Sequence, residues 1–544
     1  MSATAERTER DKLASRAGIV GAGTLLSRVL GLGRDMALAA IFTRPETDAF
    51  FVAFTIPNAL RQLLGEGAIS SAVVPVMSAK REKDGAEATR AFFAKLRGAS
   101  LLALVVVTAL GMLFAQPLTD LFAAGYRERP ADFARTVGLT RAVFPYIFFM
   151  GTAALGMAAL HAERRFAVAS FAPGLLNVAF LFASFALPGP LVAAGLDRSY
   201  AMVAGALLGG LLQVVAQWPS LRRIGYGARP RLDFSDPDVR EVLRRITPMT
   251  FGIGVYYVDL VLSRRFLSEL GAGAQSYFSW AMRLCDFPLG IFVMALSTAA
   301  LPSLASLAAA GKKEELVDTF AYGLRLTLFV ALPASALFVA LGEPLVATLF
   351  QRGEFDALAA HETGRALLWQ GGTLWTVALV RQLVAMLHAL GDTRAPVIVS
   401  ALDLAVFIAL AASLKGPFGH VGISIAVGGS STVQMLLLFV AVRRRLGTTA
   451  VERIAGSAAR TIAASVAAAV AGFAVVGLAR AALSGVGESS AAGRMLRHGL
   501  PGLAGGAAFA LAFVIAAWLV RSEELRVLGG GLARRLRRAR PAGK

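Results

Sequence analysis

Long apolar stretches dominate this chain, and short polar segments interrupt them at intervals. Leu101–Phe114, Thr461–Leu478 and Gly502–Val520 lie in such stretches. A helix needs about 20 mostly apolar residues to cross the hydrocarbon of a bilayer, so the pattern predicts about fourteen spanning helices. We place them at residues 14–42, 48–78, 92–116, 138–160, 168–188, 199–220, 246–268, 274–304, 318–342, 362–389, 394–413, 420–442, 457–479 and 500–520.

An internal repeat relates two parts of the chain. Pro75 and Pro302, each ending an apolar block, are separated by 227 residues, and so are Pro117 and Pro344. The segment FFAKLRGASL (92–101) also resembles FAYGLRLTLF (320–329). Two related halves with a site at their interface are a common plan among transporters, in which the halves rock to give alternating access.

The repeat predicts an all-α integral membrane protein with two six-helix lobes and two further helices. We expect a cytoplasmic tail at 1–13, an N-lobe at 14–240, a C-lobe at 241–450, two last spans at 451–520 and a basic cytoplasmic tail at 521–544. The apolar run near the start contains Arg28 and Arg34 and has no small-residue cleavage site, so we interpret it as a retained first span.

Composition agrees with a membrane protein and argues against an enzyme. Only 17% of the 544 residues are charged, against about 25% in soluble domains. The single cysteine excludes an intrachain disulfide, and the five histidines show no ligand spacing, so we expect neither a metal nor a bound cofactor. The chain lacks HExxH, GxSxG and phosphate-loop motifs, so we expect no catalytic residues.

Charge sorts the loops into two alternating sets. About 35 Lys and Arg fall in one set (the N-terminal tail, 80–97, 164–165, 222–245, 312–313, 394, 443–460 and the tail from 521), and about 10 fall in the other. Basic loops stay in the cytoplasm, so both termini should be cytoplasmic. The run Arg534–Arg540 suits anionic membrane lipids better than nucleic acid, because no aromatic-interleaved basic domain accompanies it.

Four arginines lie inside predicted membrane spans: Arg28, Arg34, Arg61 and Arg283. An arginine at mid-bilayer costs roughly 2.5–3.5 kcal/mol on insertion scales, so such residues normally face an interior cavity. If the repeat is real, these arginines converge between the halves. Their planar forks suit a diphosphate. The competing interpretation is that each arginine only pairs with a nearby carboxylate, among Asp35, Asp48, Glu66 and Asp286.

Two further carboxylates, Asp259 and Asp403, lie inside the seventh and eleventh predicted spans. Each suits Na⁺ binding or proton relay. The alternatives are pairing with a neighbour, such as Arg264 for Asp259, or a water-filled crevice.

The motifs that contain these residues resemble a known family. SRVLGLGRDMALAAIF and TDAFFVAFTIPNALRQLLGEGAISSAVVPV are similar to the N-terminal signature of the lipid II flippases called MurJ or MviN, and WAMRLCDFPLGIFVMALSTAALPSLA resembles their eighth-span signature. The resemblance runs from about residue 17 to 445 and implies the fold of the multidrug/oligosaccharidyl-lipid/polysaccharide exporter superfamily.

The resemblance implies a flippase that carries lipid II from the cytoplasmic to the periplasmic leaflet of the bacterial inner membrane, for peptidoglycan synthesis. It implies a central cationic cavity and a groove for the lipid tail at the last two spans. By motif match, the substrate-binding positions fall on Arg28, Arg34, Asp48, Arg61, Glu66 and Arg283. Expected partners are lipid II, membrane lipids and the cell-wall synthesis machinery, and we expect a monomer.

The chain departs from the family pattern at two places. Met282 stands where the family often has Asp before the eighth-span arginine, and Phe407 and Ala411 stand where some members place sodium ligands. The coupling source is therefore open between Na⁺, H⁺ and the membrane potential alone.

Alternatives from the same class and from other classes of protein remain. In the same class, the chain could export another polyprenyl-linked glycan or act as a small-molecule antiporter. A polytopic glycosyltransferase would need a catalytic acid or base on a sizeable extracytoplasmic loop, and the loops here are short. A scaffold for cell-wall machinery is favoured only if variants of the cavity arginines remain functional.

Overall fold

The computed structural model describes residues 23–61, 68–165, 167–252, 254–447, 450–487 and 490–527, and these ranges contain helices and no strand. The predicted all-α class is therefore confirmed for the described residues. The chain divides into two compact units, Met1–Gln275 and Ser276–Lys544. This division falls later than the lobe boundary predicted at residue 240, and the assignment of spans to lobes stays a prediction.

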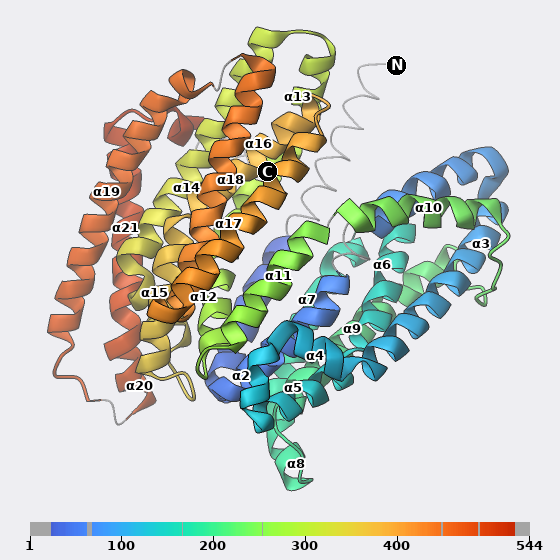
Figure 1. Cartoon of the computed structure of the whole chain (residues 1–544), viewed down its shortest axis with the longest axis horizontal. Helices are drawn as coiled ribbons and strands as arrows, with labels where there is room; N and C mark the ends of the chain where they lie inside the picture. Colours follow the sequence, from blue (N-terminus) through green and yellow to red (C-terminus); the bar gives the residue numbers. More distant parts are fainter. Residues whose placement is uncertain are drawn as a thin grey trace, which may run out of the picture. The chain divides into compact units, whose positions relative to one another are not determined.

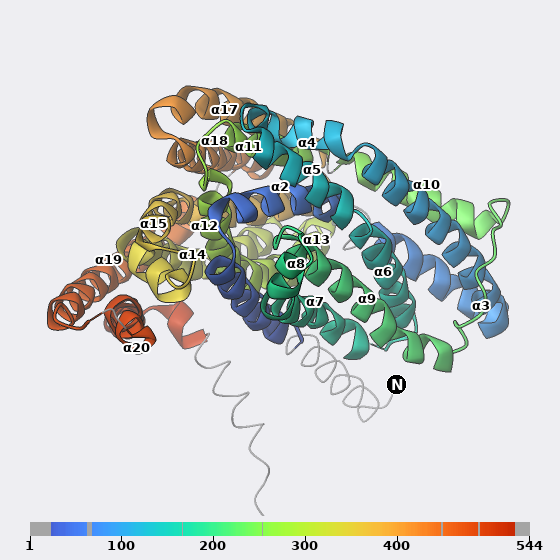
Figure 2. The same ribbon diagram turned by 90° about the horizontal axis from the view of Figure 1, so that it is seen from below.

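The first unit begins with a helix over residues 23–41. Its α6 packs against both α3 and α9, while α7 packs along α9 (Figure 1 and Figure 2). The elements are α2 Arg44–Arg61, α3 Ala68–Leu113, α4 Ala115–Ala123, the 3₁₀ turn η2 Ala124–Glu128, α5 Pro130–Val143, α6 Tyr146–Ala162, α7 Ala167–Ala186, α8 Pro188–Ala193, α9 Tyr200–Arg223, α10 Pro237–Gly252 and α11 Gly254–Ser268.

In the second unit the hairpin of α19 and α21 lies along α14 (Figure 1). The elements are α12 Ala274–Pro288, the π-helical turn η3 Leu289–Val293, α13 Met294–Ala309, α14 Lys313–Phe350, α15 Ala357–Gly372, α16 Leu374–Ala389, α17 Arg394–Phe418, α18 His420–Leu446, α19 Val451–Ala482, α20 Ala491–Arg494, the π-helical turn η4 Met495–Gly499 and α21 Leu500–Leu519.

Eight helices among the described residues are long and apolar enough to cross a bilayer. Two shorter apolar helices cover Ser170–Ala186 and Ala300–Ala309. Parts of the first, second and seventh predicted spans lie outside the described residues, and the count of fourteen stays a prediction. The surface suits lipid, because Phe473, Leu511 and Trp518 on the α19–α21 hairpin are each more than 60% exposed.

The segment 80–97, which we expected to be a loop, is helical. Two helical parts of α3 meet inside it at Gly85, whose φ of +85° and ψ of −179° are not helical and are a conformation that other residues rarely adopt. The segment REKDGAEATRAF is rich in good helix formers, so its polar residues are helical on both sides of Gly85. Pro75 and Pro302 likewise lie inside α3 and α13, which continue beyond them.

The helix packing of the first unit recurs in the second. The contacts α3–α6, α6–α9 and α7–α9 correspond to α14–α16, α16–α18 and α17–α18. The segments that resemble each other also have the same buried positions, since Phe92 and Leu96 lie in one core and Phe320 and Leu324 in the other. The packing thus agrees with the sequence repeat.

The α17–α18 hairpin gives a test of this packing. A Cβ added at Gly422 would lie 2.2 Å from the carbonyl oxygen of Leu414, whereas one at Gly416 would meet nothing within 4 Å. We expect Gly422→Ala to destabilise the protein by about 1–3 kcal/mol, because the helices must separate. Thermal unfolding in detergent should show a lower midpoint for Gly422→Ala and not for Gly416→Ala; equal midpoints would contradict the close crossing.

Candidate functional site

The first described helix, residues 23–41, places Arg34 against α7. Asn177 donates a hydrogen bond to the backbone oxygen of Ser27 at 2.8 Å and so fixes the two helices together. The Arg34 guanidinium donates to Asp35 Oδ1 at 2.9 and 2.7 Å and lies 5.4 Å from the centre of the Phe180 ring. The structure thus gives Arg34 the carboxylate partner that the competing interpretation expected.

Arg28 and Arg61 are both partly exposed. Arg28 belongs to the same helix as Arg34, and Arg61 ends α2, where its Nε donates to Asn58 Oδ1 at 3.0 Å. Glu66 lies outside the described residues. The arginines of this unit therefore have distinct local surroundings, and a common substrate contact stays a prediction.

Asp48 holds the connection between α11 and α12. Its side chain is only 3% exposed, and its Oδ2 accepts a hydrogen bond from the Gly273 amide at 2.6 Å. Arg264 and Gln275 close the same connection, because Arg264 donates to Gln275 Oε1 at 3.0 Å and Gln275 donates to the Arg264 carbonyl at 2.6 Å. A buried carboxylate that accepts a backbone N–H makes a strong, charge-assisted contact.

The turn after α4 also binds this connection. Arg129 Nη2 donates to the carbonyls of Ser268 and Leu270 at 3.1 and 3.2 Å, and the Gly125 amide donates to the Ser268 hydroxyl at 3.1 Å. We call these contacts of Asp48, Arg264, Arg129 and Gly125 with residues 268–275 the clasp. Sequence analysis missed the clasp, since its residues are far apart in the chain.

In the second unit, α12 presents Arg283 and Asp286 as exposed residues one helical turn apart. Trp280 on the same helix is fully buried and packs against Phe350, with 5.4 Å between ring centres. Arg283 is therefore exposed although Trp280, one turn before it on the helix, is buried. Whether Arg283 meets the arginines of the first unit stays a prediction.

The two candidate ion-coupling residues lie in α11 and α17. Asp259 is partly buried. Asp403 has a buried Oδ1 with no hydrogen-bond partner among the described residues, and the Ser430 hydroxyl lies beside its carboxyl. Phe407 and Ala411, at the positions where some family members place sodium ligands, are buried apolar residues whose side chains have no oxygen. In the described ranges no group of three or more His, Cys, Asp or Glu could hold a metal ion.

Ionic contacts outside the spans predicted from the sequence join segments of the same predicted side. In the more basic set, Lys80 pairs with Asp238 at 2.5 Å and Arg445 with Asp392 at 2.8 Å. In the less basic set, Arg135 pairs with Asp197 at 2.7 Å and Arg480 with Glu343 at 3.4 Å. The charge sorting of the loops is thus reflected in their contacts within each unit.

The same contacts shift the pKa values of two loop carboxylates, Asp197 and Asp392. Burial raises the pKa of Asp197, but hydrogen bonds from Arg135 and Ser199 outweigh it, so its pKa lies below the ordinary value. Hydrogen bonds from the Ala395 amide and then from Arg445 lower the pKa of Asp392. Both carboxylates are therefore held in their charged form.

Long apolar helices with arginines inside their spans define a polytopic membrane transporter, and solved structures share its fold. A structure described as an inward-facing multidrug resistance MATE family transporter of the MOP superfamily aligns with a TM-score of 0.63 at 15% identity, covering 78% of this chain and 95% of that one. A structure described as lipid II flippase MurJ, inward closed conformation, aligns with a TM-score of 0.73 at 21% identity, covering 92% and 98%.

Sequence comparisons are more specific. The profile of the family described as "Lipid II flippase MurJ" matches residues 38–490. The lipid II flippase MurJ of Burkholderia cenocepacia is 34% identical over 435 residues, covering 78% of this chain and 82% of that protein. The probable lipid II flippase MurJ of Bdellovibrio bacteriovorus is 31% identical over 444 residues, covering 80% and 83%. The chain belongs to the lipid II flippase MurJ family, which confirms the resemblance found in its motifs.

Proposed function

We propose that this protein moves lipid II across the bacterial inner membrane, from the cytoplasmic to the periplasmic leaflet, without covalent chemistry. The observation that carries the proposal is the family match, which extends over residues 38–490. The apolar helices supply the membrane-spanning scaffold. The distribution of basic loops supports cytoplasmic termini.

The substrate presents a diphosphate, and we assign its binding to Arg28, Arg34, Arg61 and Arg283, with Asp48 and Glu66 as the acidic positions of the site. Guanidinium forks bind phosphate oxygens through paired, charge-assisted hydrogen bonds. Arg34 enters this set already paired with Asp35, so its guanidinium can exchange one anionic partner for another. The tail groove at 451–520 and the coupling source, whether Na⁺, H⁺ or the membrane potential, stay predictions.

Alternating access needs two bodies that move and a connection that guides them. Each unit has its own packed cores. The clasp holds residues 268–275 onto the first unit. The second unit begins at the next residue, Ser276, inside α12. We therefore assign the clasp as the fixed end of the connection about which the units rock.

A leaflet-accessibility assay tests the proposed function. Cells depleted of this protein should expose less lipid II to a membrane-impermeant reagent outside the inner membrane, and the total amount of lipid II should rise because its synthesis continues. Re-expression of the wild-type chain should restore exposure. Undiminished outer-leaflet lipid II in depleted cells would reject the proposal.

A further inference from the structure

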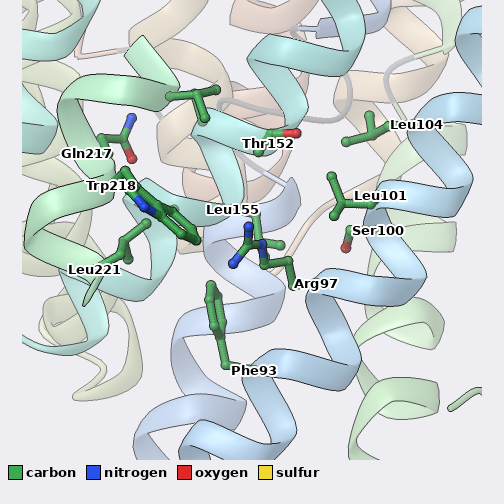
Figure 3. A pocket seen from close by; sticks show the side chains of 13 residues that line it. Phe93, Arg97, Ser100, Leu101, Leu104, Thr152, Leu155, Gln217, Trp218 and Leu221 are labelled. Carbon is green, nitrogen blue, oxygen red and sulfur yellow. The ribbon is translucent and has the colours of Figure 1, made fainter. Parts of the chain in front are cut away.

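A cavity of about 350 Å³ lies in the second unit, where the ends of α14 and α19 meet η4 and the start of α15 (beside α20 in Figure 1). Pockets for small ligands have about this size, roughly 300–1,000 Å³. A hollow of the first unit, between α3, α6 and α9, is far smaller (Figure 3). Its volume of about 30 Å³, beside Arg97 and Trp218, is room for one or two water molecules. Of these two hollows, only that of the second unit has room for a polyatomic ligand.

Basic side chains from two segments line the cavity of the second unit. Arg480 lies in the last turn of α19, and Arg497 and His498 lie in η4. Glu343 of α14 is the one acid among the described residues that line the cavity. Positive charge is therefore in excess at its walls, and guanidinium groups bind anions through charge-assisted hydrogen bonds. The lining suits an anionic ligand.

Glu343 holds Arg480 only loosely. The Oε2 of Glu343 lies 2.9 Å from Nδ1 of His361. Its Oε1 accepts from Arg480 Nη2 at 3.4 Å, which is longer than the 2.7–2.9 Å or about that of a well-formed charge-assisted hydrogen bond. The Arg480 side chain is also 53% exposed, and exposed pairs of this kind contribute only about 0–1 kcal/mol. A better-placed anion can therefore take Arg480 from Glu343 at little cost.

Other arginines of the less basic loop set have closer carboxylates. Arg135 pairs with Asp197 at 2.7 Å, and Arg198 pairs with Glu46 at 2.8 Å. Three of the roughly ten Lys and Arg in this set fall in the segment 480–498, which has a single acid. Because positive charge is normally retained on the cytoplasmic side, this cluster goes against the general trend of membrane proteins. Binding of an anion is a physical reason for keeping it there.

The crossing of α14 and α21 fixes one wall of the cavity. Thr348 Oγ1 lies 2.8 Å from the carbonyl oxygens of both Pro344 and Gly499, to which it can donate. A Cβ added at Gly502 would lie 2.2 Å from Thr348 Oγ1 and 2.3 Å from the Pro344 oxygen. The two helices therefore meet closely beside Pro344 and Pro501, which line the cavity. A wall that is already ordered lowers the entropy cost of binding a ligand.

Exposed apolar side chains flank these lining residues along the chain. Leu496 of η4 and Leu500 and Leu503 of α21 are 45%, 41% and 54% exposed. Such residues suit contact with acyl chains, whereas Arg480 and Ser484 are exposed polar residues. The cavity is therefore open both to a phosphate carried by a lipid and to a phosphate that arrives from water.

We propose that the cavity between α14, α15, α19 and η4 binds a phosphate group, carried by a membrane lipid or by a free phosphate or diphosphate. The phosphate oxygens accept from the guanidinium groups of Arg480 and Arg497, and the His498 ring adds a further donor. Arg480 leaves Glu343, which keeps its contact with His361. The assignment rests on the lining and charge of the cavity and not on the proposed transport; only its periplasmic side follows from the predicted topology.

A cysteine in the cavity wall reports whether the cavity is occupied. Ser484 lines it and is exposed, whereas the native Cys285 is buried, so Ser484→Cys in the purified full-length chain should react with a neutral maleimide. Inorganic diphosphate should slow this reaction in detergent, and sodium chloride at equal ionic strength should not. Adding Arg480→Gln should raise the diphosphate concentration for half protection roughly tenfold, as expected for the loss of one charge-assisted contact. Arg127→Gln, which removes an exposed arginine of the first unit paired with Asp120, should leave it unchanged.

Nanodiscs of phosphatidylcholine then identify the source of the phosphate. Protection of Ser484→Cys by added phosphatidic acid assigns the site to a lipid phosphate, and protection by diphosphate alone assigns it to a free anion. No protection by diphosphate in detergent, equal protection by chloride, or unchanged half protection in Arg480→Gln would each overturn the proposal. Because the readout lies in the cavity itself, such a result together with reduced lipid II exposure in depleted cells rejects this site and leaves the proposed function standing.

Discussion

Alanine in place of Arg28, or in place of Arg283, is expected to abolish complementation of a strain depleted of its own lipid II flippase. In the proposed site each guanidinium would give the diphosphate paired, charge-assisted hydrogen bonds worth about 3 kcal/mol, so losing one should weaken transport roughly 100-fold. The measurement is plating efficiency after depletion, with the amount of membrane-inserted variant determined on the same cells.

Two matched substitutions sharpen this prediction. Lysine at either position keeps the charge but loses the planar fork, so it should restore growth only in part. Arg352→Ala should complement fully, because Arg352 is exposed and donates to carbonyls of its own helix end, Thr348 and Leu349. Full growth with both Arg28→Ala and Arg283→Ala, at normal protein levels, would remove these residues from the mechanism.

Asp48→Ala is expected to lower the free energy of unfolding by about 1.5–3 kcal/mol, because a buried carboxylate that accepts a backbone N–H makes a charge-assisted hydrogen bond. The lost contact is the one to the Gly273 amide, and it anchors the clasp. Asp48→Asn retains an acceptor oxygen and should lose less. Thermal unfolding in detergent measures both, and transport assays at matched protein levels report whether a loosened clasp also slows flipping.

The control for Asp48 is Asp318→Ala. Asp318 is also an ion-paired acid, but its side chain is 65% exposed and its partner is Arg453, so its loss should change stability by only about 0–1 kcal/mol. An unfolding midpoint for Asp48→Ala equal to that of Asp318→Ala would mean that the Gly273 contact does not stabilise the connection.

Much of the fold was predictable because a bilayer imposes a length on each helix. The stretches 394–413, 420–442 and 457–479 were predicted as spans from apolarity alone, and they lie in α17, α18 and α19. The sorting of the loops by charge was also predictable, because it needs only the Lys and Arg content of each loop. The Lys80–Asp238 pair joins two segments of the more basic set.

The contacts of the site were harder to predict, because they join residues distant in sequence. Asp48 and Gly273 are 225 residues apart, and nothing in the TDAFF motif shows that its acid would accept from that amide. From the sequence, Asp48 is predicted only as a substrate-binding position or as an ion-pair partner of a nearby arginine. The helix through 80–97 was missed for the opposite reason, since polarity signalled a departure from the membrane but not an end of the helix.

The central claim is that guanidinium groups from both units bind one diphosphate. An experimental structure of the full chain with bound lipid II tests it most directly. We predict that density for the diphosphate lies within hydrogen-bond distance of Arg28 or Arg34 and also of Arg283. Side chains splayed apart, each locked to its own acid, with the diphosphate elsewhere, would contradict the account.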